Sequence, residues 1–145
     1  MISDMFNSGA MPVLERMVQF TGARHGVIAD NIANLSTPHF RPRDLNPHEF
    51  QQQLRQAVDR RRATASPIDG PLDFARSEQL TFHADRLEAR PQPLDENILF
   101  HDRNNRDLER IMQDLAENTA VHNVSIQLMR SEMSIMQTAI RETIR

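Results

Sequence analysis

Residues 106–144 carry an apolar repeat that fits one long helix. Stepping alternately by four and three residues visits eleven positions, and eight of them are apolar. This is the heptad spacing of helices that pack along one another, and Asn105 is a suitable N-cap. The spacing predicts a helix over 106–144 with a seam along one side: Leu108, Met112, Leu115, Thr119, His122, Ile126, Met129, Met133, Met136, Ile140 and Thr143.

A second apolar row lies beside this seam. It makes the apolar surface wider than a two-stranded coiled coil needs, so we expect two or more neighbouring helices around this one. The residues of this row are Val121, Val124, Leu128, Ile135 and Ala139.

A second helical pattern lies near the N-terminus and ends before Pro38. It predicts a helix over 12–34, opened by Pro12, with apolar residues from Leu14 to Ile32. At 1.5 Å per residue the two helices would measure roughly 58 and 35 Å, which leaves about 20 Å of the seam uncovered. We therefore expect other chains to cover the remainder.

The middle of the chain has weaker signals. Asn46 and Pro47 indicate the N-cap and first residue of a short helix through about Arg62. Residues 63–103 are interrupted by prolines and predict an irregular region, with a small β-hairpin left open. The predicted fold is all-α: long terminal helices packed as an antiparallel, coiled-coil-like pair. Residues 1–40 and 104–145 would form one discontinuous helical domain, with 41–103 as connector and irregular central region.

Composition argues against several classes of function. All 17 basic residues are Arg, and with 20 acidic residues the net charge is −3, so no general attraction to nucleic acid is expected. Cysteine is absent, the six histidines lack metal-ligand spacing, and no nucleophile motif is present. We expect no enzyme activity, cofactor, metal or small-molecule substrate. The sequence also lacks a secretory signal pattern and a transmembrane segment.

Two motifs point to a family. Residues 29–38 read Ala-x-Asn-Ile-Ala-Asn-x-Ser-Thr-Pro and are followed by Phe40 and by Arg-Pro-Arg-Asp over 41–44. Together with residues 104–109, 115–118 and 133–141, this pattern resembles the bacterial flagellar basal-body rod proteins, and their proximal rod members above all. The family usually has glycine where this chain has His39, which leaves open whether the turn keeps a positive φ.

The resemblance implies a structural subunit of the proximal rod, exported by the flagellar type III apparatus without a cleaved signal peptide. It implies copies of itself, other rod subunits, a rod adaptor, and the inner-membrane ring and export gate as partners. The sister proximal rod protein and a soluble coiled-coil adaptor or chaperone remain alternatives. The hypothesis places the assembly interface at Asn31, Ile32, Asn34, Thr37, Pro38, Ile126, Met129, Met133, Met136 and Ile140.

Overall fold

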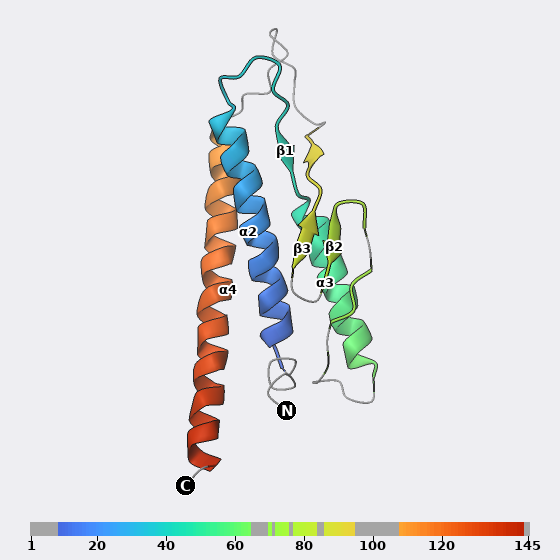
Figure 1. Ribbon diagram of the computed structural model, residues 1–145, viewed down its shortest axis with the longest axis vertical. Helices are drawn as coiled ribbons and strands as arrows, with labels where there is room; N and C mark the ends of the chain where they lie inside the picture. Colours follow the sequence, from blue (N-terminus) through green and yellow to red (C-terminus); the bar gives the residue numbers. More distant parts are fainter. Residues whose placement is uncertain are drawn as a thin grey trace.

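The computed structural model describes residues 9–64, 70, 72–75, 77–83, 86–94 and 108–143. In this part of the chain, three helices and four short strands occur in the order shown in Figure 1. The helices are α2 (Met11–Ala33), α3 (Pro47–Arg62) and α4 (Leu108–Thr143). Their bounds agree with the predicted helices to within about two residues. The proposed N-cap of the last helix, Asn105, lies outside the described residues.

Helices α2 and α4 form the predicted antiparallel pair. The end of α2 lies beside the start of α4, and α4 then runs back along α2 and past its first residue (Figure 1). Hydrogen bonds set this register, because Arg24 meets Asp114 and Thr21 meets Asn118. Since α4 has 36 residues and α2 has 23, α4 is longer by roughly 20 Å.

The short helix α3 begins where the sequence predicts. Asn46 has extended backbone angles, and its side-chain Oδ1 accepts hydrogen bonds from the backbone N–H groups of His48 and Glu49, at 3.0 and 3.2 Å. Pro47 occupies the first turn, where its missing N–H costs nothing. A local capping rule is therefore enough to fix this helix start.

The central region contains two antiparallel pairs of strands. Strands β2 (Leu80–Phe82) and β3 (Leu87–Ala89) form the small hairpin that the sequence left open. Strands β1 (Arg43–Asp44) and β4 (Gln92–Pro93) also pair. The sequence analysis did not predict the second pair, because two-residue strands are too short to show an alternating pattern.

A hydrophobic cluster holds α3 and the hairpin against α2, on the side away from α4 (Figure 1). The rings of Phe20 and Phe50 stack with their centroids 4.1 Å apart, and Leu45 and Leu80 are fully buried beside them. Helix α2 is thus packed on two sides, with this cluster on one and α4 on the other.

Candidate assembly surface

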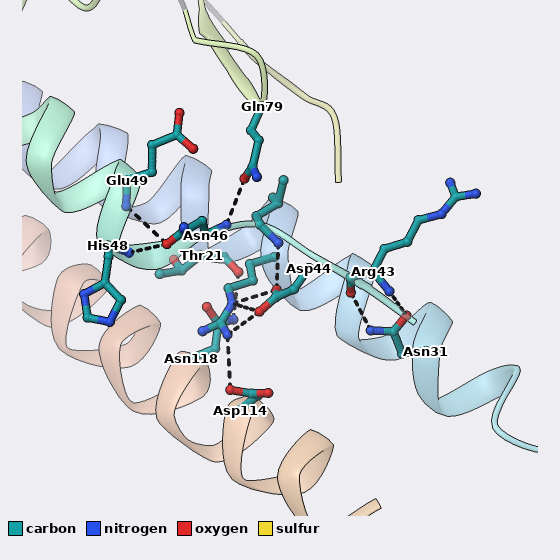
Figure 2. Close-up of polar contacts among 12 residues, drawn as sticks. Thr21, Asn31, Arg43, Asp44, Asn46, His48, Glu49, Gln79, Asp114 and Asn118 are labelled. Carbon is teal, nitrogen blue, oxygen red and sulfur yellow. Dashed lines mark hydrogen bonds and ion pairs between the residues drawn. The ribbon is translucent and has the colours of Figure 1, made fainter. Parts of the chain in front are cut away.

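A buried ion cluster joins α2, β1 and α4. The Arg24 guanidinium donates to both carboxylate oxygens of Asp44, at 2.6 to 3.2 Å, and to Asp114 at 3.2 Å (Figure 2). The Asp44 carboxylate also accepts from the backbone N–H of Leu45 at 2.8 Å. One side chain therefore ties three elements together that are far apart in the sequence.

The two carboxylates of this cluster differ in how closely they interact with the positive charge of Arg24. Burial lowers the pKa of Arg24, but the hydrogen bonds and charges of Asp44 and Asp114 outweigh it and hold that pKa above its ordinary value. Burial raises the pKa of Asp114, and repulsion by Asp44 adds to it, while attraction by Arg24 offsets only part. Asp44 is accordingly the main partner of Arg24, in agreement with the shorter distances.

Polar side chains continue along the interface between α2 and α4. Asn118 is buried and donates to the backbone carbonyl of Thr21 at 2.9 Å, while the Thr21 hydroxyl lies 2.8 Å from His122 Nδ1. Ser125 is fully buried and donates to the Val121 carbonyl one turn earlier. The histidine in the predicted seam is thus a satisfied interfacial imidazole.

The seam predicted on α4 is divided by the structure. Ile126, Met129 and Met136 are half-buried, whereas Met133 and Ile140 are exposed. The buried residues among those described on α4 are instead Ile111, Asn118 and Ser125, spaced by seven. The α2-facing stripe is therefore rotated slightly from the predicted seam. The reason is that small polar side chains occupy buried positions, and the seam was predicted from apolar residues.

The apolar surface of α4 faces outward. Among the described residues, every exposed large hydrophobic side chain belongs to α4. Val124 is 53% exposed and Ile135 61% exposed, while Asn118 and Ser125 on the inner side are 3% and 0% exposed. Val121, Val124, Leu128 and Ile135, here called the outer row, form a surface that no described part of the chain covers. This apolar row was evident in the sequence, but it lies outside the interface hypothesised from the sequence.

The motif at the end of α2 holds the chain that follows it. Asn31 is buried, and its amide donates to the carbonyl of Arg43 at 2.6 Å while its Oδ1 accepts from the Arg43 N–H at 3.0 Å (Figure 2). Asn34 donates to the Asp30 carbonyl and accepts from the Thr37 hydroxyl. Asn31 and Asn34 thus make contacts within the chain that shape the turn. Ile32 is half-buried, and Thr37 and Pro38 are exposed.

His39 adopts the left-handed conformation that the sequence left open. Its φ is 62°, and the backbone N–H of Phe40 bonds back to the carbonyl of Thr37 at 3.3 Å. With Pro38 second and a positive φ third, this is the pattern of a type II turn, in which glycine is the usual third residue. The backbone geometry is therefore kept despite the histidine.

Replacing His39 with glycine should stabilise the chain. The left-handed conformation costs a residue with a Cβ about 1 to 2 kcal/mol, and the greater freedom of glycine in the unfolded chain offsets part of this gain. We expect the free energy of unfolding to rise by up to about 1 kcal/mol, measured by urea denaturation. His39→Ala keeps the Cβ and should give no comparable gain; equal effects of both variants would show that the backbone angle is not the cause.

The described residues offer neither a metal site nor a membrane-spanning helix. They contain no group of three or more His, Asp or Glu side chains placed to hold a metal ion. No helix in the same ranges is both long and apolar enough to cross a membrane.

Comparison with known proteins gives a consistent result. No family model matches the chain. The chain is 23% identical to the flagellar basal body rod protein FlgB of Yersinia enterocolitica over 92% of its length and 95% of that protein, and the figures are the same for FlgB of Yersinia ruckeri. With only 8% of the chain uncovered, these matches include the motif at residues 29–38. That resemblance is thereby confirmed: the chain is similar, at low identity, to flagellar basal body rod proteins named FlgB.

Proposed function

We propose that the chain is a structural subunit of the bacterial flagellar rod, at its proximal end, and that it helps to form the axial shaft that transmits torque. Similarity to two FlgB proteins along almost the whole chain supports this role. A structural role needs no substrate or cofactor. It does need surfaces by which subunits bind one another.

The main observation in support of the proposal is that α4 exposes large apolar side chains and buries polar ones. Large apolar side chains of the outer row are exposed, while Asn118 and Ser125 lie inside the α2–α4 pair. A continuous row of exposed large apolar side chains marks an association site. We infer that α4 faces other helices in the assembled state, so that its outer row becomes buried between subunits.

The turn after α2 and the far end of α4 complete the proposed interface. Ile32, Thr37 and Pro38 would contact neighbouring subunits, while Asn31 and Asn34 would hold the turn in the shape that those contacts need. On α4 the proposed contacts are Ile126, Met129, Met133, Met136 and Ile140, together with the outer row.

The proposed partners are other rod subunits and further copies of this chain in a helical assembly. At the proximal end, a rod adaptor and components of the inner-membrane ring and export gate would also be neighbours. The proposed location is the periplasmic rod of the basal body, reached through the flagellar export apparatus without a cleaved signal peptide. Nucleic acid and small molecules have no part in this function.

Copurification tests the assignment. The chain would be tagged in its native host, and detergent-extracted hook and basal-body particles would be probed for it by immunoblot. We expect the chain in these particles and loss of motility when its gene is deleted. A small soluble oligomer in the cytosol, with motility intact after deletion, would overturn the rod assignment and favour a coiled-coil adaptor.

A charge on the exposed end of α4 should block incorporation. Met133 is exposed in the free chain, so Met133→Asp should leave folding intact but place a charge in a desolvated interface, at a cost of several kcal/mol. We expect the variant to be absent from extracted particles. Ser134→Asp, at an exposed neighbouring position between the Met133 stripe and the outer row, is the matched control and should incorporate; normal incorporation of Met133→Asp would remove this part of α4 from the interface.

A further inference from the structure

The two ends of the α2–α4 pair differ in shape. At one end, the last turn of α2 lies beside the start of α4 (Figure 1). At the other end, residues 130–143 of α4, here called the overhang, extend past the first residue of α2. The α2–α4 pair therefore has a level end and a projecting end.

A groove of about 370 Å³ lies at the level end. Val27, Phe40 and Pro91 supply apolar surface, and Asp30 and Arg43 supply opposite charges, with Asn31 and Asn34 completing the lining. Only the main chain of Arg43 is used by Asn31, and its guanidinium extends away from that contact (Figure 2). The groove thus combines an apolar lining with an acidic and a basic group.

The last turn of α2 has no basic residue, so no positively charged side chain of that turn offsets the negative end of the helix dipole. The carboxylate of Asp30, which is exposed, adds negative charge at the same place. A cation from another molecule is the group that would complement this end of α2.

The overhang carries matching groups. Met133, Met136 and Ile140 follow the three- and four-residue spacing of one helix stripe, and this stripe continues the α2-facing side of α4 beyond the point where α2 begins. Arg141 directly follows Ile140, about 100° around the helix from it, and is exposed in the last turn. Flexible methionine side chains adapt readily to a groove of irregular shape.

We propose that the overhang of one copy docks in the groove of a second copy, with Met133, Met136 and Ile140 against the apolar lining and Arg141 beside Asp30. This inference rests on the proposed assembly role and adds the axial contact by which it would occur. Because the two surfaces lie at opposite ends of the α2–α4 pair, the contact is heterologous and can repeat from one copy to the next.

Cross-linking tests this contact directly, since the chain has no cysteine. The variant Arg43→Cys with Ile140→Cys would carry one thiol in the groove and one on the overhang. Within one chain the two thiols are separated by more than the roughly 35 Å length of α2, because Ile140 lies beyond the first residue of α2, so a short bismaleimide cannot join them. We expect a ladder of covalent multimers from the full-length protein at high concentration, and monomers from each single-cysteine variant.

Three controls separate this contact from other associations. Arg55→Cys with Ile140→Cys, which moves the first thiol to an exposed position on α3, should give no ladder. Asp30→Arg or Arg141→Asp alone should reduce the ladder several-fold, and the two together should restore it. No ladder above the Arg55 control, or dimers from Ile140→Cys alone, would overturn the proposed contact. The rod assignment would still stand if the tagged chain copurified with basal bodies.

Discussion

Arg24→Met should lower the free energy of unfolding by about 3 to 5 kcal/mol, the usual cost of removing one partner from a buried ion cluster. Methionine retains the aliphatic stem and its helix propensity, so the charge is the main change. Asp44 and Asp114 would then face each other at the junction of α2, β1 and α4 without a cation between them. Urea denaturation followed by circular dichroism measures the loss.

The matched control is Arg55→Met. Arg55 is exposed on α3, and the same substitution there should change stability by no more than about 0.5 kcal/mol. If Arg24→Met cost no more than this control, water would have to reach both carboxylates in the folded chain. The ion cluster would then not be the element that ties α4 to β1.

Phe50→Ala should cost about 3 to 5 kcal/mol as well, because it removes a buried ring and leaves a cavity. Phe50 stacks on Phe20, and its ring centroid lies 6.1 Å from that of Phe82 in the hairpin. The substitution therefore weakens the attachment of α3 and of the hairpin to α2. Compared with the unsubstituted chain, amide hydrogen exchange in the variant should accelerate more in α3 and β2 than in α4.

Phe74→Ala is the comparison for this effect. Phe74 is only half-buried, although its ring centroid lies 4.2 Å from that of Phe82. We expect Phe74→Ala to lower the free energy of unfolding by less than half as much as Phe50→Ala. Equal costs would place the main stabilising contact at the hairpin and not at the stack between α2 and α3.

Features with local causes were the ones that sequence reasoning predicted well. Asn46 caps α3 through N–H groups two and three residues away, and Pro47 fixes the first helical residue. The bounds of α2 and α4 follow from apolar spacing and from Pro38, which also needs only neighbouring residues. The packing of the two long helices against each other was predicted from their apolar faces, and their antiparallel direction was part of the predicted fold.

The polar interface could not be predicted in this way. Arg24, Asp44 and Asp114 are separated by 20 and 70 residues in the sequence, and each looks like an ordinary surface charge when read alone. Asn118 and Ser125 are polar, so a search for apolar residues at heptad positions passes over them. Their spacing of seven was the sequence feature that could have placed them on the buried side of the helix. Periodicity shows which faces of a helix are apolar, but it cannot tell whether its own chain or another chain covers them.

The unequal ends of the α2–α4 pair give the molecule a polarity. If copies align in one direction along an axis, every stack has a level face at one extremity and a projecting one at the other. Assembly of the stack would then begin and end on chemically different surfaces, so a different protein could cap each end. Because a repeating contact of this kind contains no stop signal, the number of copies would have to be set by those caps and not by the chain itself.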